Sequence, residues 1–349
     1  MQQQLRIWIF NTMFDIYLKK LLNDESLTST EAQQAMNEIM TGKVSDIKLS
    51  AWLTALKLKG ENADEICGCA TSMNEHSIKV DSQDNACIDI VGTGGDGAKT
   101  FNISTAAAFV AAGAGVSVAK HGNRAVSSKS GAADVLTELG INIDIDAEIM
   151  EKCLQDIGIS FLFAQKLHPA MKYAMPVRKE LGTRTIFNIL GPLSNPAKTQ
   201  RMVIGVYSKH LCRLIAEATL QMGKEHILVV YGNDCLDEIT TTTTTHICEL
   251  KNGTISEYDF NPEEYGIPMA KIQDISGGTP KENAAIIRSV FSGKQKGPER
   301  DIILINAAAG IYVSGKANSW NAAIALANES LDSGNARKKL QGLIETTND

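Results

Sequence analysis

The residues best suited to chemistry begin with a glycine-rich turn. Residues 91–97 read VGTGGDG, and residues 102–105 read NIST. Glycine lets the backbone approach a ligand closely, so successive N–H groups can hold phosphate oxygens, and the start of a following helix adds its positive dipole end. The pattern is neither G-x-x-x-x-G-K-S/T nor G-x-G-x-x-G, so it indicates an anion site unlike that of an ATPase or a dinucleotide enzyme. A plain strand-to-helix turn is the alternative.

A second loop, at residues 120–131, reads KHGNRAVSSKSG. Three cations, a histidine, an asparagine and three hydroxyl groups in so short a segment suit a ligand with several phosphates. As a charge run alone, the segment would be interpreted as a solvated surface loop. Two anion-suited loops, each after a predicted strand, favour the ligand-binding interpretation, because open α/β sheets bind ligands at the carboxyl ends of their strands.

Asp237 and Glu238 form an acidic pair after another predicted strand. Their carboxylates are hard oxygen ligands of the kind that magnesium prefers, although ordinary loop acids are an equal alternative. The seven cysteines are odd in number and lack the paired C-x2-C spacing of a zinc site. They predict reduced thiols in a cytoplasmic protein.

The elements that must position these residues fall into two groups. Helical patterns cover the first 80 residues: a capped run from Leu27, a run from Ser45 to Lys59 with Ile47 and Leu58 among its apolar positions, and a run from Glu61 to Glu75. From Cys87 onward, short apolar strands alternate with helices, and long helical runs follow from about Asn283. The expected strands lie at 87–91, 116–119, 202–206, 226–231 and 247–250, and residues 103–113 are expected to be helical.

The predicted fold class is therefore α/β, with a small α-helical N-terminal domain and a larger domain built on a mostly parallel central sheet. The expected domains are residues 1–82, with the helices around 168–192 packing against them, and residues 83–349.

Composition limits the classes of function. The 349 residues include 34 Lys and Arg against 40 Asp and Glu, a formal net charge of −6, which disfavours a nucleic-acid partner. No stretch approaches the roughly 20 apolar residues that span a bilayer. The cations are unevenly distributed: residues 97–133 contain four and no acid, and residues 164–204 contain seven and a single acid. This distribution favours anionic small molecules as ligands.

The motifs in order resemble one known family. GTGGD, KTFNIST at 99–105, KHGNRAVSSKSGAADVL at 120–136, HPAMKYAMPVRKELGTRTIFNILGPLSNPA at 168–197 and the acidic pair Asp237-Glu238 closely resemble the anthranilate phosphoribosyltransferases of tryptophan biosynthesis. The resemblance extends from about Phe14 to Leu343 and implies a nucleoside phosphorylase-like phosphoribosyltransferase fold. Its implied ligands are anthranilate and phosphoribosyl pyrophosphate, its cofactor is Mg²⁺, and its assembly is a homodimer.

The resemblance also implies residue roles. Lys120 and Arg178 would be catalytic; Gly92, Asn123 and Arg178 would bind anthranilate; and Ser104, Asp237 and Glu238 would hold magnesium. The residues implied to bind phosphoribosyl pyrophosphate are Gly92, Gly95, Asp96, Thr100, Asn102, Ile103, Ser104, Thr105, Lys120, His121, Gly122, Asn123, Arg124, Ala125, Val126, Ser127, Ser128 and Ala132.

One position departs from the family pattern, and some alternatives stay open. The family often has serine where this chain has Ala132, which removes a hydroxyl worth about 1 kcal/mol as a hydrogen-bond partner. Neither His121 nor His168 is predicted to be a general base. The rival functions are a pyrimidine nucleoside phosphorylase-like enzyme and a non-enzymatic nucleic-acid-binding relative of the fold.

Overall fold

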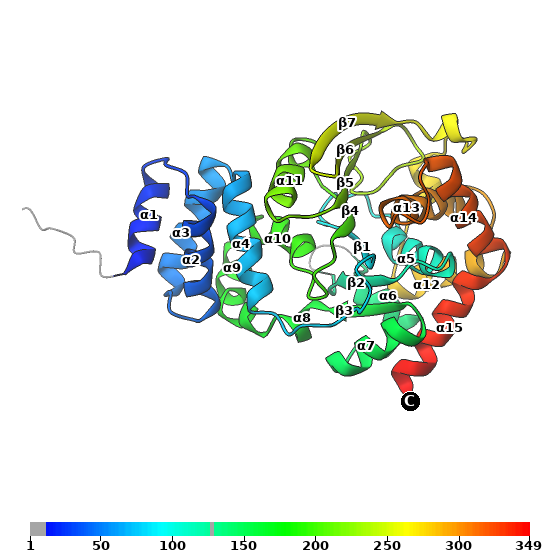
Figure 1. The fold of residues 1–349 in the computed structure, drawn as a ribbon, viewed down its shortest axis with the longest axis horizontal. Helices are drawn as coiled ribbons and strands as arrows, with labels where there is room; N and C mark the ends of the chain where they lie inside the picture. Colours follow the sequence, from blue (N-terminus) through cyan, green and yellow to red (C-terminus); the bar gives the residue numbers. More distant parts are fainter. Residues whose placement is uncertain (1–11, 126–128) are drawn as a thin grey trace, which may run out of the picture. The chain divides into compact units, whose positions relative to one another are not determined.

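The computed structural model describes residues 12–125 and 129–349. The chain divides into two compact units: one contains the residues up to His76 together with Ala170–Leu190, and the other contains Ser77–Pro169 and Gly191–Asp349. Figure 1 labels the elements of both units along the chain. The residues just after His76 belong to the second unit, where Val80 packs with Cys87 and Leu162.

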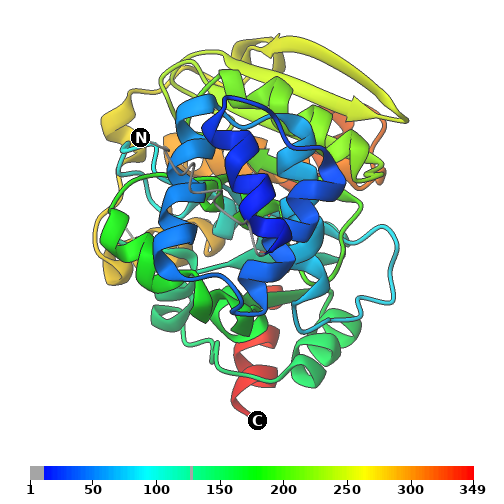
Figure 2. The ribbon, with the colours of Figure 1, turned by 90° about the vertical axis from the view of Figure 1, so that its left-hand side faces the viewer.

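The described residues of the first unit form helices and connecting turns, without a strand. Its helices are α1 (Met13–Leu22), α2 (Ser29–Met40), α3 (Asp46–Lys59), α4 (Ala63–Glu75) and α9 (Met175–Leu181). Capping boxes begin α2 and α4, in which Thr28 and Asn62 exchange hydrogen bonds with Glu31 and Glu65, because the first N–H groups of a helix lack partners within it. Figure 2 shows α1 to α4, in blue, turned toward the viewer.

Only some of the apolar residues of α3 are buried. Trp52, Leu53 and Leu56 are buried, whereas Ile47 and Leu58 are 84% and 82% exposed. Ile47 and Leu58 are eleven positions apart, which is about three helical turns, so they lie on one solvent-facing side of α3. The apolar residues at helical spacing in α3 are therefore divided between the core and the solvent.

The second unit is built on a sheet of seven strands in the order β3-β2-β1-β4-β5-β6-β7. The strands are β1 (Ile88–Gly92), β2 (Val118–Gly122), β3 (Ile159–Phe163), β4 (Arg201–Gly205), β5 (His226–Gly232), β6 (Thr245–Lys251) and β7 (Thr254–Phe260). The first five strands pair in parallel, and β6 and β7 add an antiparallel edge. The predicted α/β fold class with a mostly parallel sheet and a small helical domain is confirmed.

Helices surround this sheet within the second unit. They are α5 (Ile103–Gly113), α6 (Ala132–Glu138), α7 (Ala147–Asp156), α8 (Ala164–Leu167), α11 (His210–Gln221), α12 (Pro280–Phe291), α13 (Pro298–Val313), α14 (Trp320–Asp332) and α15 (Asn335–Asn348). Two further segments, α10 (Phe187–Leu193) and the 3-10 helix η1 (Pro169–Tyr173), cross the division between the units, and the 3-10 helices η2 (Pro262–Tyr265) and η3 (Ile272–Ile275) follow β7.

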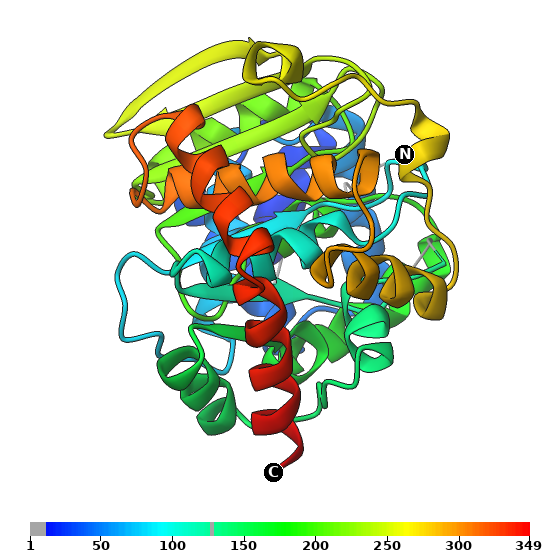
Figure 3. The same ribbon diagram turned by 90° about the vertical axis from the view of Figure 1, so that its right-hand side faces the viewer.

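The main core lies between the sheet and α5, α13, α14 and α15, which Figure 3 shows in front of the sheet as cyan, orange and red helices. The sequence of α5, ISTAAAFVAAG, is apolar on every side, which is typical of a buried helix. In α13, a Cβ at Gly310 would lie 2.6 Å from Ile90 Cδ1, so glycine lets this helix pack closely on β1. The sheet is thereby held rigidly beneath the loops that leave its strand ends.

Candidate active site

The loops after β1, β2 and β5 leave one edge of the sheet. Gly92, the last residue of β1, lies opposite Gly205, the last residue of β4, and Gly205 lies opposite Val230 near the end of β5. The strands run in the same direction, so their carboxyl ends meet at this edge, where ligands bind in folds of this type. The sequence-predicted glycine-rich loop, basic loop and acidic pair all follow these strands.

The glycines of this edge let the acidic pair approach the sheet. A Cβ at Gly205 would lie 1.6 Å from the backbone oxygen of Asp237, and one at Gly92 would lie 2.5 Å from Asp237 Oδ2. Gly94 and Gly95 adopt φ angles of 67° and 79°, a region that residues with a Cβ rarely occupy. Glycine at these positions therefore allows the turn to form and lets Asp237 pack against the ends of β1 and β4.

The two carboxylates accept backbone hydrogen bonds from the glycine-rich loop and the helix after it. Gly94 donates its N–H to Asp237 Oδ2 at 2.7 Å, and Ser104 donates its N–H to Glu238 Oε1 at 3.2 Å. Burial, together with the nearby Asp96 carboxylate, raises the pKa of Asp237 to about 7. Burial and the Asp237 charge raise the pKa of Glu238 well above its ordinary value. Raised pKa values of two neighbouring buried carboxyl groups are typical of a site that receives a cation.

Lys120 lies beside this cluster. Its side chain is buried, and Nζ donates to the backbone oxygen of Ile90 at 2.7 Å and to Ser104 Oγ at 3.4 Å. Burial lowers the pKa of Lys120, and the charges of Asp89 and Glu238 oppose that shift. The structure thus brings Lys120, Ser104, Asp237 and Glu238 together.

The basic loop is organised by Asp134, in the first turn of α6. Asp134 Oδ2 accepts the N–H groups of Ala125 and Gly131, both at 2.9 Å, and Oδ1 pairs with Arg124 at 3.1 Å. Asn123 Oδ1 accepts the N–H of Arg124 at 2.8 Å. Val126, Ser127 and Ser128, which the resemblance implied as ligand contacts, lie outside the described residues.

Ala132 is the first residue of α6, and its Cβ would be 3.2 Å from a Cβ built at Gly122. Residue 132 therefore borders the end of β2, at the edge where the candidate ligand groups gather. Its methyl group supplies no hydrogen bond, so only backbone groups are available to a ligand there.

Asn102 ties the two loops together. Its Oδ1 accepts Ser130 Oγ at 3.0 Å and Asn283 Nδ2 at 2.9 Å, and its Nδ2 donates to the Ser130 backbone oxygen at 3.2 Å. Thr100 forms an isolated bridge to Ser276. These bonds hold the segment before α5 against the end of the basic loop.

Ile103 and Thr105 lie in the first turn of α5 but are almost fully buried, at 1% exposed each. Ile103 therefore offers a ligand nothing but its backbone. Thr105 Oγ1 has no hydrogen-bond partner among the described residues. The buried side chains of both residues contribute to the site mainly by fixing the position of the first turn of α5.

His121 and His168 form a buried pair with ring centroids 5.1 Å apart. Burial lowers the pKa of His121 to about 3 and that of His168 to about 4, so both imidazoles are neutral near pH 7. His121 Nδ1 lies 3.2 Å from the backbone oxygen of Gly191. Neutral rings in these positions serve packing and orientation, not acid catalysis.

Arg178 belongs to the helical unit and not to the sheet unit. It lies on α9 with its guanidinium 5.0 Å from the ring centre of Phe187, and Nη1 lies 3.8 Å from the sulfur of Met175. Burial lowers its pKa. No acidic side chain among the described residues pairs with Arg178, so its fork of N–H donors is available for an anionic ligand.

Two organising residues were missed by the sequence reasoning. Asp89 is fully buried in β1, accepts the N–H of His121 at 3.3 Å, and accepts Asn195 Nδ2 at 2.7 Å. An acid in the middle of the apolar run CIDIV was the available signal. Asp134 had a weaker signal, an acid three positions after Gly131 at a helix start.

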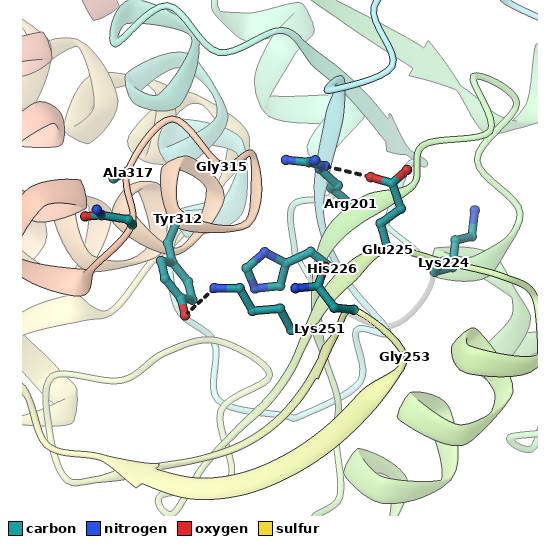
Figure 4. A pocket seen from close by; sticks show the side chains of 11 residues that line it. Arg201, Lys224, Glu225, His226, Lys251, Gly253, Tyr312, Gly315 and Ala317 are labelled. Carbon is teal, nitrogen blue, oxygen red and sulfur yellow. Dashed lines mark hydrogen bonds and ion pairs between the residues drawn. The ribbon is translucent and has the colours of Figure 1, made fainter.

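A cavity of about 430 Å³ lies elsewhere in the second unit (Figure 4). Arg201 and His226, the first residues of β4 and β5, line it, so it borders the amino ends of the strands, opposite to the candidate site. Its charged groups are already engaged: Arg201 pairs with Glu225 at 3.2 Å, and Lys251 donates to Tyr312 at 3.1 Å. We therefore assign the chemistry to the strand carboxyl ends and not to this cavity.

Comparison with known proteins identifies the family of this chain. Residues 84–337 match the family model described as the glycosyl transferase family a/b domain, and residues 16–77 match the helical bundle domain of the same family. An anthranilate phosphoribosyltransferase of Clostridium kluyveri is 48% identical over 336 residues, which are 96% of this chain and 100% of that protein. The chain belongs to the anthranilate phosphoribosyltransferase family.

Solved structures of anthranilate phosphoribosyltransferases are similar throughout. The enzyme of Thermus thermophilus has a TM-score of 0.91 and 40% sequence identity, covering 95% of this chain and 99% of its own. The Saccharomyces cerevisiae enzyme in complex with PRPP and Mg has a TM-score of 0.87 and 32% identity, covering 96% and 98%. The predicted family is confirmed. Among the described residues, no helix is both long and apolar enough to cross a membrane.

Proposed function

We propose that this protein transfers the phosphoribosyl group of phosphoribosyl pyrophosphate to the amine of anthranilate. The amine nitrogen forms a bond to the anomeric ribose carbon, the bond from that carbon to the pyrophosphate oxygen breaks, and the amine loses a proton. The products are N-(5-phosphoribosyl)anthranilate and pyrophosphate. The observation that carries the proposal is the meeting of the glycine-rich loop, Lys120 and the acidic pair at one sheet edge in a chain of this family.

The polyphosphate is the ligand we assign to the two loops. We assign the phosphates to the glycine-rich loop, and the basic loop supplies Arg124 and Lys120. Such donors stabilise the charge that grows on pyrophosphate as it leaves, an electrostatic effect that is commonly the largest in catalysis. The buried Lys120 needs no reorganisation to act in this way.

The donor set fits a magnesium ion. Asp96, Asp237 and Glu238 bring three carboxylates together, and the buried Lys120 ammonium beside Ser104 offsets one of their charges. Two negative charges are left uncompensated, which one divalent cation balances, and carboxylate and hydroxyl oxygens are the ligands that Mg²⁺ accepts. We propose that Asp237, Glu238 and Ser104 hold it. When bound, the ion supplies positive charge to the leaving pyrophosphate.

Anthranilate requires a group that recognises its carboxylate. We propose Arg178 for this role, because its planar guanidinium suits a two-point grip and carries no competing acid among the described residues. Gly92 and Asn123 are proposed as further contacts. A fixed orientation of the amine supplies the proximity effect, which is worth several kcal/mol in favourable cases.

The proposed reaction needs no general base from the chain before attack. A neutral aryl amine already has a free electron pair, and the nearest imidazoles are buried and neutral. The residues therefore have three tasks: they bind the polyphosphate, orient the amine and stabilise the departing charge.

The test is an anthranilate fluorescence assay with phosphoribosyl pyrophosphate and Mg²⁺ present. We expect the fluorescence to fall with time, and to stay constant when phosphoribosyl pyrophosphate or magnesium is omitted. Phosphate-dependent cleavage of uridine or thymidine with constant anthranilate fluorescence would favour the nucleoside phosphorylase alternative instead. Tight binding of DNA or RNA with neither activity would favour the non-enzymatic alternative.

We also propose a homodimer formed through the helical unit. Met13 and Ile16 on α1 are 53% and 44% exposed, and Ile47 and Leu58 on the neighbouring α3 are more exposed still. Exposed apolar side chains gathered on adjacent helices are typical of an association surface. Light scattering should give twice the chain mass, and Ile47→Asp should shift it toward the monomer. A wild-type monomer at micromolar concentration would exclude this assembly.

A further inference from the structure

A cluster of metal-ligating side chains lies on the antiparallel edge of the sheet, outside the site described above. In the register of β6 and β7, Cys248 lies opposite Glu257 and His246 lies opposite Asp259. Residues that are two apart on a strand, and residues directly opposite each other, share one face of a sheet. All four side chains therefore belong to one face, and α11 packs against the same strand β6 (Figure 1).

Three donor atoms of this cluster converge. His246 Nε2 lies 3.8 Å from Cys248 Sγ and 3.4 Å from Glu257 Oε2, and all three atoms lie within 4.8 Å of one another. Around a tetrahedral zinc ion, the usual bond lengths place sulfur and nitrogen about 3.6 Å apart, and nitrogen and oxygen about 3.4 Å apart. The two distances from His246 Nε2 are therefore close to those around a bound ion, and Cys248 Sγ and Glu257 Oε2 lie within 4.8 Å of each other.

The groups behind these donors fix their orientation. His246 Nδ1 lies 3.2 Å from Asp259 Oδ1, an arrangement that leaves Nε2 facing Cys248 and Glu257. A carboxylate on the far nitrogen of a histidine is the usual companion of a metal ligand. Arg213 of α11 binds Glu257 Oε1 at 3.2 Å and leaves Oε2 directed at His246.

Among the described residues, the donor atoms that lie within 4.8 Å of one another are those of His246, Cys248 and Glu257, so water is left as the fourth ligand of an ion bound there. Glu257 is 38% exposed, so an ion from solvent can reach the cluster through its outer side.

We propose that His246 Nε2, Cys248 Sγ and Glu257 Oε2 bind a borderline-soft divalent cation such as Zn²⁺, with water as the fourth ligand. Thiolate and imidazole donors select zinc over magnesium and calcium, which require oxygen. The site differs in chemistry from the all-oxygen magnesium site proposed for Asp237 and Glu238. Binding joins β6 to β7, so it stabilises the antiparallel edge of the sheet and does not depend on the transferase reaction.

The experiment uses the full chain, reduced, freed of metal with a chelator and then dialysed. Zn²⁺ is titrated in competition with a chromogenic chelator, and Co²⁺ is titrated separately for its thiolate charge-transfer absorption. We expect one ion per chain, cobalt absorption typical of thiolate ligation, and a higher thermal unfolding midpoint with zinc. Asp259→Asn should weaken zinc binding by about 10- to 100-fold, as expected for loss of such a supporting carboxylate.

Two ligand variants and one control complete the design. Glu257→Gln changes a partly exposed side chain, and Cys248→Ser is a nearly isosteric change, so both should keep the circular dichroism of the parent while losing most zinc affinity. Cys235→Ser removes an exposed thiol outside the cluster and should bind zinc like the parent.

Three outcomes would overturn the proposal. They are no zinc bound at micromolar concentration, equal affinity in the parent, Glu257→Gln and Cys248→Ser, or loss of affinity in Cys235→Ser alone. Thiol titration and mass measurement of the unreduced chain add a further such outcome, because a Cys212–Cys248 disulfide as the stable form would leave no thiolate to bind the ion.

Discussion

Gly205→Ala is expected to disable the candidate active site without removing any ligand-binding side chain. An alanine Cβ at residue 205 would lie 1.6 Å from the backbone oxygen of Asp237, whereas real Cβ contacts are essentially never closer than 3.0 Å. The obstructing atom is backbone, so rotation of a side chain cannot relieve the clash. The loop that carries Asp237 and Glu238 must instead move away from the end of β4.

The required movement sets the size of the effect. Separating the two atoms to 3.0 Å displaces the Asp237 backbone by at least about 1.4 Å. In the parent chain, Asp237 Oδ2 lies 2.7 Å from the Gly94 nitrogen. That shift takes the bond beyond hydrogen-bonding distance and also disturbs the bond of Glu238 to Ser104. A misplacement of about 1 Å can cost about 100-fold in rate. We therefore expect kcat/KM to fall about 100-fold and the magnesium concentration for half-maximal activity to rise.

The assay is steady-state anthranilate consumption at several magnesium concentrations, with circular dichroism to verify folding. Gly342→Ala is the matched control, because its Cβ would meet Ile157 at an ordinary 3.4 Å within α15. That substitution should leave kcat/KM unchanged and stabilise the chain by up to about 1 kcal/mol through helix propensity. If Gly205→Ala retains kcat/KM and magnesium dependence within twofold of the parent, the close packing of Asp237 against β4 has no role in the transferase reaction.

Three further predictions concern single side chains. Arg178→Ala should raise the KM for anthranilate by about 10- to 100-fold, the value of a charged hydrogen-bonded contact, and leave the KM for phosphoribosyl pyrophosphate unchanged; steady-state kinetics with an unchanged anthranilate KM would remove Arg178 from the site. Glu238→Gln and Asp237→Asn should each shift magnesium titrations of activity to higher concentration, and a titration identical to that of the parent would exclude the residue as a ligand. The pKa of His168 is about 4 in the folded chain against about 6.5 unfolded, so the unfolded state binds more protons below pH 6.5 and stability falls as the pH drops toward 4. His168→Gln should recover about 2 kcal/mol of the stability that the parent loses between pH 8 and pH 5 in denaturant titrations, and parallel profiles would contradict a buried neutral imidazole.

The sequence predicted most of the sheet unit because its strands are short apolar runs that end in glycine-rich loops. The helix predicted at 103–113 coincides with α5, and the five expected strands overlap β1, β2, β4, β5 and β6, each beginning within two residues of the observed start. Two strands were not predicted. ISFLF of β3 is apolar on both faces and has no periodicity, and TISEYDF of β7 forms an exposed edge whose polar residues resemble a loop.

The site was predictable only in part, for a physical reason. Loops after neighbouring strands are expected to meet at one edge, so the proximity of Lys120 to the acidic pair follows from topology. The roles of Asp89, Asp134 and Gly205 depend on which atoms approach one another in three dimensions, and residue types along the chain do not encode this. The exposure of Ile47 and Leu58 has the same origin, because a helical period identifies a face but not what covers it.

The most direct test of the central claim is to measure pyrophosphate release and anthranilate consumption in the same reaction. With the wild-type chain, phosphoribosyl pyrophosphate and Mg²⁺, we predict equal amounts of the two, with mass spectrometry showing one phosphoribosyl group added to anthranilate. Without anthranilate, pyrophosphate should not accumulate. Pyrophosphate release with anthranilate left intact, or no release under any of these conditions, would contradict the assignment of this sheet edge to phosphoribosyl transfer.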